Sequence, residues 1–150
     1  MEHLLKGRDV ASVGAIVTSP PYLGVLRYGA FNWIRLWFLG HGPAEIDRLL
    51  DGTDSVDSYL SFMTSVLKSA AKVLRRDGVL VMVIGDVVEA GQHVRLANRV
   101  WDELGDLVPF ELICIHADRF DQTLKTTRIW GEDKKGRATP LDRYVVLRRE

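Results

Sequence analysis

The sequence has almost no cysteine, no long hydrophobic run and no net charge, and each of these absences excludes a class of protein. A single cysteine in 150 residues can form neither a disulfide framework nor a cysteine zinc site. Because Cys114 lies inside an apolar run, we expect it in the core. The richest apolar stretch, residues 31–39, is interrupted by Arg35 and is far shorter than the roughly 18 residues of a membrane span.

The first eight residues mix charged side chains with no small-residue cleavage site, so we expect no signal or transit peptide and a cytoplasmic protein. With 47% hydrophobic and 27% charged residues, the composition is that of one globular domain, residues 1–150. Disordered, collagen-like and coiled-coil chains are excluded. His93 and His116 have no partner at ligand spacing, so we also expect no metal site.

The charges are unevenly distributed, although Lys and Arg number 20 and so do Asp and Glu. Residues 119–150 carry nine basic and five acidic side chains. Within this part of the chain, residues 118–143 form a long basic loop between the last two expected strands. Two interpretations stay open: a strip that contacts nucleic acid, or an ordinary solvated loop.

Four short apolar segments are predicted as strands, at residues 13–17, 79–84, 110–116 and 144–147. Helical spacing between the first two predicts a helix that Asp54 caps and that ends at Asp77-Gly78. A second helix is expected over residues 93–104. This alternation predicts an α/β fold, with about four strands and helices on both faces of the sheet.

Residues 31–39 and 44–50 predict two further short helices that follow the first strand. An aromatic stripe at helical spacing is more often core than binding surface, so we expect Trp33 and Trp37 in the core.

The most informative segment is Thr18-Ser19-Pro20-Pro21-Tyr22, which directly follows the first predicted strand. It resembles the catalytic motif of the amino-group DNA methyltransferases that use S-adenosylmethionine, and the Thr-Ser-Pro-Pro-Tyr form is similar to the cytosine-N4 branch. The helix, the Arg-Arg-Asp-Gly sequence, the apolar strand and Gly85-Asp86 then follow in the family's order. The resemblance implies a partial Rossmann-like class I methyltransferase sheet, S-adenosylmethionine as cofactor and DNA as substrate.

The residue types suit this chemistry. An exocyclic base amine is a weak nucleophile until two acceptors draw its hydrogens out of the ring plane. We expect the Ser19 hydroxyl and the Pro20 carbonyl to be these acceptors, and Tyr22 to stack on the extruded base. Thr18 and Pro21 would hold the loop. A rigid turn without chemistry is the competing interpretation.

The resemblance implies weaker assignments at other positions. Cofactor contacts are expected from three residues at the ends of strands: Thr18, Gly85 and Asp86. Nucleic-acid contacts are expected from five residues in the connecting segments: Arg27, Tyr28, Lys125, Arg128 and Trp130. Plain turn or loop roles remain the alternative for all of them.

The family's glycine-rich cofactor motif, Phe-x-Gly-x-Gly after a strand, has one literal match, at residues 38–42. It ends an apolar helical stretch and Pro43 follows it, so we interpret it as a helix stop and a turn. The chain therefore resembles the catalytic half of a methyltransferase, which would bind S-adenosylmethionine only together with a partner chain.

Three hypotheses follow. The chain is one half of a split cytosine-N4 enzyme, which predicts an exposed apolar sheet edge beside residues 13–17. Alternatively, it is a non-catalytic module that self-associates or binds nucleic acid. Finally, it methylates another amine, in adenine or in RNA.

Overall fold

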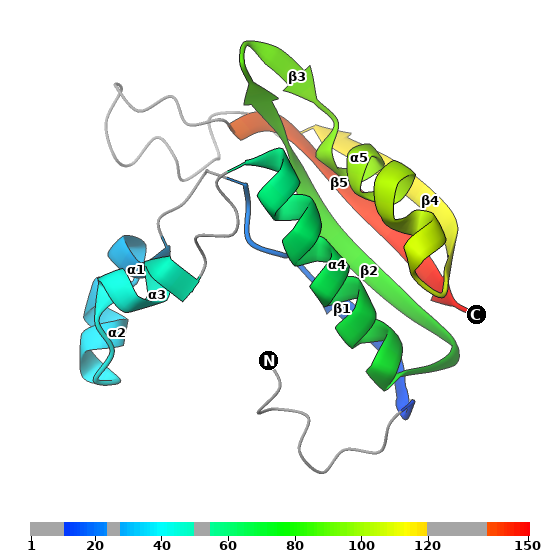
Figure 1. Cartoon of the computed structure of the whole chain (residues 1–150), viewed down its shortest axis with the longest axis horizontal. Coiled ribbons are helices and arrows are strands. Elements are labelled where there is room, and N and C mark those ends of the chain that lie inside the picture. Colours follow the sequence, from blue (N-terminus) through cyan, green and yellow to red (C-terminus); the bar gives the residue numbers. More distant parts are fainter. Residues whose placement is uncertain (1–10, 24–27, 50–54, 120–137) are drawn as a thin grey trace.

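The computed structural model describes residues 11–23, 28–49, 55–119 and 138–150, and in these it contains one twisted sheet, two helices that cover it, and a group of three short helices (Figure 1). The strands are β1 (Val13–Thr18), β2 (Leu74–Glu89), β3 (Gln92–Val94), β4 (Phe110–Arg119) and β5 (Ala138–Arg149). The helices are α1 (Tyr28–Phe31), α2 (Trp33–Phe38), α3 (Pro43–Leu49), α4 (Val56–Val73) and α5 (Leu96–Leu104).

The sheet has the order β1-β2-β5-β4, and the short β3 pairs with β2. β1 and β2 are parallel and joined through α4, whereas β5 is antiparallel to both of its neighbours. The predicted α/β class is confirmed, and each of the four predicted strands is present. β3 adds a fifth strand that the sequence analysis did not anticipate.

One face of the sheet is buried beneath α4 and α5, which contact each other and lie on the same side (Figure 1). Strand pairing places Leu147 beside Leu80 and Val145 beside Met82, and all four are at most 1% exposed. Tyr59, Met63 and Leu67 recur every four residues along α4 and belong to the same core. Each buried large apolar side chain contributes roughly 1.5–3 kcal/mol.

The start of α4 differs from the expectation. Ser55 caps the helix, and its Oγ accepts the backbone N–H of Ser58 at 3.2 Å. The predicted cap, Asp54, lies outside the described residues.

The end of α4 also differs, because the helix stops at Val73 and β2 begins at once with Leu74. The predicted stop at Asp77-Gly78 is instead a tight bend inside β2, where Asp77 has φ of 60°. A Cβ at position 78 would lie 2.8 Å from the Arg75 carbonyl oxygen, so packing requires glycine there.

The second helix starts later than expected because residues 87–94 form a β-hairpin. Its turn is Ala90-Gly91, with φ of 48° and 78°, which is the signature of a two-residue hairpin turn. His93 therefore lies on β3, and α5 begins at Leu96.

The opposite face of the sheet is only partly covered over the described residues. Strand pairing aligns Val17, Val81, Val146 and Cys114 in one row across β1, β2, β5 and β4, and we call this row and its neighbours the valine face. Val17 is 76% exposed, so this face has no cover at β1. Among the described residues no helix lies on this side, which corrects the expectation of helices on both faces (Figure 1).

Cys114 is exposed, so the prediction of a core cysteine is wrong. The apolar run that contains it is β4, an edge strand that presents alternate residues to the valine face.

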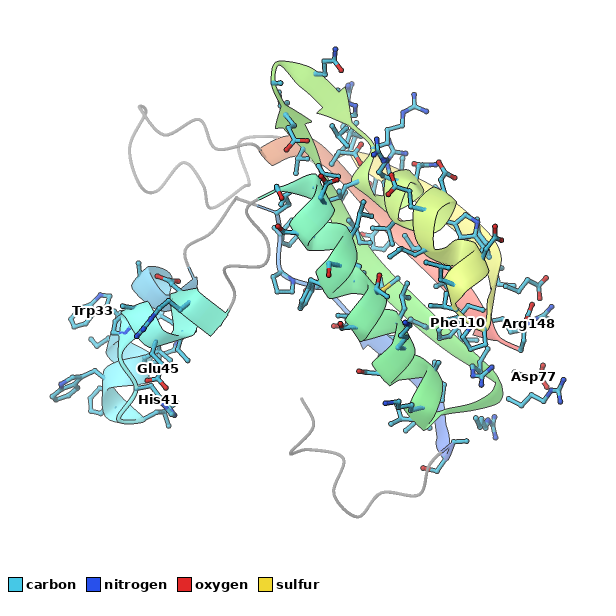
Figure 2. All side chains as sticks on the ribbon, viewed as in Figure 1. Trp33, His41, Glu45, Asp77, Phe110 and Arg148 are labelled. Carbon is cyan, nitrogen blue, oxygen red and sulfur yellow. The ribbon has the colours of Figure 1, made fainter. Side chains whose placement is uncertain are left out.

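The three short helices form their own group. A Cβ at Gly29 of α1 would lie 2.0 Å from the Pro43 carbonyl oxygen, and the Gly29 N–H donates to Asp47 Oδ1 at 2.6 Å. α2 has no buried residue, and its Trp33 is 57% exposed (Figure 2). Trp37 is 68% exposed, so the prediction of both rings as core is wrong. Among the described elements, α2 makes its main contacts with α1 and α3.

Candidate active site

The Ser-Pro-Pro-Tyr segment leaves the sheet at the carboxyl end of β1, where Thr18 is the last strand residue. Ser19 is exposed, Pro20 is buried, and Pro21 and Tyr22 are partly buried. The proline rings fix φ, so the loop leaves β1 with a defined backbone, and Ser19 at its start is exposed. Ligands of open α/β sheets bind beyond the carboxyl ends of strands, which is where this segment lies.

Tyr22 is seated on β2. A Cβ at Gly85 would lie 2.6 Å from Tyr22 Cε1 and 2.7 Å from Cδ1, so only glycine leaves room for the ring. The Tyr22 hydroxyl donates a hydrogen bond of 3.3 Å to Asp142 Oδ2 on β5. The aromatic ring, which follows β1 in the chain, is thereby held against Gly85 of β2 and Asp142 of β5.

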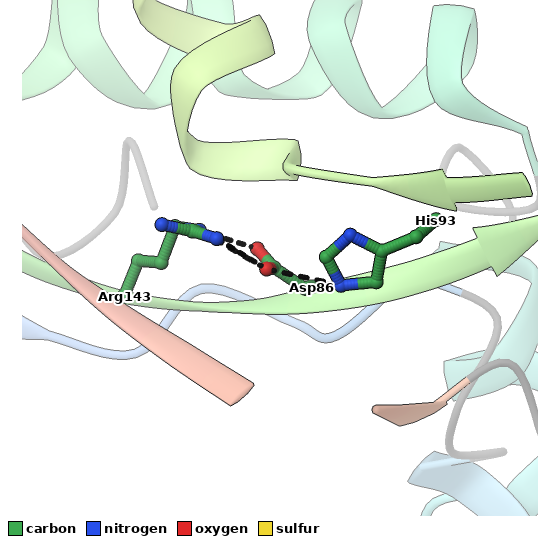
Figure 3. Close-up of polar contacts among 3 residues, drawn as sticks. All are labelled: Asp86, His93 and Arg143. Carbon is green, nitrogen blue, oxygen red and sulfur yellow. Dashed lines mark hydrogen bonds and ion pairs between the residues drawn. The ribbon is translucent and has the colours of Figure 1, made fainter. Parts of the chain in front are cut away.

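The next residue of β2, Asp86, is a carboxylate whose side chain is fully buried. Arg143 donates to it from Nε and Nη2, each with a contact of 2.8 Å, and His93 Nε2 lies 3.3 Å from its Oδ2 (Figure 3). The Arg143 side chain is only 12% exposed, whereas that of His93 is 42% exposed. The two-pronged contact joins β2 to β5 just where their register shifts, between Gly85 and Val87.

The structure places the expected cofactor residues as follows. Thr18 ends β1, Gly85 is covered by the Tyr22 ring, and Asp86 faces Arg143 and His93. Their contact with a cofactor stays a prediction.

The expected nucleic-acid residues fall largely outside the described part of the chain. Arg27, Lys125, Arg128 and Trp130 lie outside it, and Tyr28 is described only as the first residue of α1.

Two residues of this site were missed by the sequence analysis. Asp142 and Arg143 were counted only as members of the charged C-terminal part. Their signal in the sequence was an acid-base pair immediately before an apolar run, and in the structure both residues lie within β5, paired with Gly85 and Ile84 of β2.

The mixed α/β sheet matches the class I methyltransferase fold. The chain matches the DNA methylase family of N6/N4 type over residues 13–146, and it belongs to that family. Among curated proteins, none matches this chain.

Solved structures share the fold. PvuII DNA methyltransferase, described as cytosine-N4-specific, matches with a TM-score of 0.61 and 17% identity, over 98% of this chain and 46% of its own. The candidate DNA modification methylase TTHA0409 from Thermus thermophilus matches with a TM-score of 0.54 and 19% identity, over 98% of this chain and 49% of its own. A structure of the same protein complexed with S-adenosyl-L-methionine matches with a TM-score of 0.53 and 21% identity, over 99% of this chain and 49% of its own. This chain thus spans about half the length of the solved proteins that it matches.

The described residues do not fit a complete site for the S-adenosylmethionine that the family implies. The one Phe-x-Gly-x-Gly match lies at the end of α2, where Gly40 has φ of 75°. It does not follow a strand, which agrees with its interpretation from the sequence as a helix stop and a turn. The Tyr22 ring covers Gly85, and the Asp86 carboxylate accepts hydrogen bonds from Arg143.

The described residues lack two further kinds of feature, a membrane-spanning helix and a metal-binding cluster. None of their helices is both long and apolar enough to cross a membrane. Nor do they contain a group of three or more His, Cys, Asp or Glu side chains that could hold a metal ion.

Proposed function

We propose that this chain is the base-binding, catalytic half of a DNA cytosine-N4 methyltransferase that acts in the cytoplasm. The observation that carries the proposal is the exposed Ser19 at the tip of β1, followed by two prolines and by a tyrosine ring held on Gly85. The family supports methylation of an amino group in DNA. The serine at the head of the motif favours cytosine as the target base.

In this proposal the chain handles the acceptor amine. Ser19 Oγ and the Pro20 carbonyl oxygen accept its two hydrogens, which frees the nitrogen lone pair from the ring. Tyr22 stacks on the extruded base and offsets about 1–3 kcal/mol of the lost stacking. S-adenosylmethionine, when bound, would supply the methyl group: the C–S bond to its sulfonium sulfur would break, S-adenosylhomocysteine would leave, a C–N bond would form, and one N–H proton would pass to water.

A second polypeptide completes the enzyme in this proposal. The match to only about half of each solved relative supports a missing half that carries the glycine-rich motif. β1 is an edge strand of the sheet and Val17 is 76% exposed, which is the apolar edge that the split-enzyme hypothesis expects. DNA would be held in addition by Arg27, Tyr28 and the basic residues Lys125 and Arg128, with Trp130.

The test is a methyl-transfer assay. The full chain is mixed with a polypeptide that carries a strand followed by Phe-x-Gly-x-Gly, radiolabelled S-adenosylmethionine and DNA, and the DNA is then digested to nucleosides. We expect N4-methylcytosine, formed only when both chains are present. Replacing the acceptor with Ser19→Ala should lower the rate by about 100-fold or more, whereas Ser61→Ala, at an exposed serine on α4, should leave it unchanged.

Each alternative has its own result. N6-methyladenine or a labelled RNA would assign the third hypothesis in place of the first. DNA binding or self-association without transfer would favour the non-catalytic module. Transfer that survives Ser19→Ala at the original rate would disprove the role given to the motif.

A further inference from the structure

The hydroxyl of Tyr22 is hydrogen-bonded to Asp142, which lies 120 residues further along the sequence. This bond holds the far end of the tyrosine side chain. The Tyr22 ring is fixed near its base by the proline loop and along one edge by Gly85. The hydroxyl, at the far end of the side chain, donates to Asp142 Oδ2 at 3.3 Å. A ring attached at both ends cannot change rotamer without breaking a bond to a carboxylate.

Asp142 is itself held in place from the other side of β5. Its neighbour, Arg143, pairs with Ile84, whose side chain is buried on the helix-covered face, whereas Asp142 pairs with Gly85. Consecutive strand residues point to opposite faces, so Arg143 reaches Asp86 on one side while Asp142 reaches Tyr22 on the other. The buried Arg143–Asp86 contact therefore fixes the position of the aspartate that holds the tyrosine.

We propose that Asp142 is a positioning residue that holds the Tyr22 ring in the orientation needed to stack on the target base. The proposal rests on the proposed function, since it assigns a role in the same site. Asp142 acts through the Tyr22 hydroxyl and does not contact the reacting atoms. Its expected contribution is kinetic, because misplacing a stacking group lowers the fraction of bound base that is correctly oriented.

The first test uses the full chain alone and needs no activity. Carbon-13 labelling of the four tyrosine rings gives NMR signals, of which the Tyr22 set is identified by its loss in Tyr22→Phe. In Asp142→Ala we expect the Tyr22 signals to move to the positions of a freely rotating tyrosine. In Asp142→Asn, which keeps an oxygen acceptor, they should stay near those of the wild type.

The structure offers a matched control on the same strand. Tyr144 donates from its hydroxyl to Asp118 Oδ2 on β4, also at 3.3 Å, and Asp118 is the strand partner of Asp142. Asp118→Ala should therefore move the Tyr144 signals and leave those of Tyr22 in place. Unchanged Tyr22 signals in Asp142→Ala, or equal movement of them in Asp118→Ala, would overturn the proposal.

The second test measures transfer by the assembled enzyme. Asp142→Ala and Tyr22→Phe should each lower kcat about tenfold with little change in the KM for DNA, as loss of a charge-assisted hydrogen bond predicts. The double variant should be no slower than either single variant, and Asp142→Asn should recover most of the rate. Asp118→Ala should match the wild type.

Additive losses in the double variant would show that Asp142 acts by another route and would overturn the proposal. Tyr22→Phe removes a single oxygen and keeps the seated ring, so it tests the bond even where Asp142→Ala does not fold. A wild-type assembly without transfer would overturn the proposed function. The NMR comparison, which needs no activity, would then still test whether Asp142 holds the Tyr22 ring.

Discussion

Gly85 carries no side chain, and this absence is what admits the Tyr22 ring. In Gly85→Ala the new methyl group would lie 2.6 Å from the ring and 3.1 Å from Asp142 Oδ1, so the ring must leave its seat. We expect the free energy of unfolding to fall by about 1–3 kcal/mol, as for other overpacked sites. Urea denaturation measures the loss.

Two comparison variants isolate this effect. Gly14→Ala places a methyl group only 3.6 Å from the flexible Arg75 side chain, so it should change stability by less than about 0.5 kcal/mol. In a Tyr22→Ala background the cost of Gly85→Ala should largely disappear. A Gly85→Ala cost that is the same in both backgrounds would refute the seating of Tyr22 on Gly85.

Tyr144 gives a prediction on pH. Partial burial, together with the charge and hydrogen bond of Asp118, raises the pKa of Tyr144 above its ordinary value of 10.0. Since the folded pKa is higher than the unfolded one, the stabilisation is complete below pH about 10 and is lost as pH rises through the folded pKa. In Asp118→Asn, tyrosinate absorbance should show the Tyr144 pKa lowered, whereas Asp102→Asn should leave it in place.

At the scale of elements, the junction of β2 and β5 depends on the buried Asp86–Arg143 contact. Asp86→Ala would leave a guanidinium that is 12% exposed without its carboxylate, so we expect a loss of about 3–5 kcal/mol in the free energy of unfolding. The exposed Arg148–Glu111 pair has the same chemistry on the same strand, with side chains 48% and 49% exposed. Arg148→Ala should cost at most about 1 kcal/mol, and equal losses from the two variants would contradict the structural role of Asp86.

Helix α2 carries aromatic side chains that the core does not use. The double variant Trp33→Ser/Trp37→Ser should change the free energy of unfolding by less than about 0.5 kcal/mol per site, because both rings are exposed. Met63→Ala, at a fully buried position of α4, should cost about 2–5 kcal/mol. A loss in the double variant comparable with that of Met63→Ala would place the two rings in a core after all.

The same elements show which structural features could be predicted from the sequence and which could not. The strand at residues 13–17 and the repeat of Tyr59, Met63 and Leu67 were predictable because period and turn residues are local properties. The exposure of Trp37 was not, because apolar periodicity defines a face without saying whether anything packs on it. The Tyr22–Asp142 bond was beyond prediction as well, since it depends on the antiparallel register of β5, which no local pattern specifies.

For the whole molecule, the valine face and the β1 edge are where the proposed second polypeptide would dock. Val17→Lys adds a charge to a side chain that is 76% exposed, so the chain alone should keep its stability within about 0.5 kcal/mol. Assembly with the glycine-motif polypeptide should be lost, as measured by sedimentation of the mixture. Lys68→Ala, on the exposed face of α4, serves as the control, and assembly that survives Val17→Lys would exclude this face as the docking surface.

The row that joins Val17, Val81, Val146 and Cys114 ends in the only thiol of the chain. Because that thiol is exposed, a maleimide dye attaches there without any engineered residue, at one defined spot on the surface. The rate of Cys114 alkylation then reports whether this face is covered: it is fast while the face is accessible to solvent and slow once another polypeptide covers it.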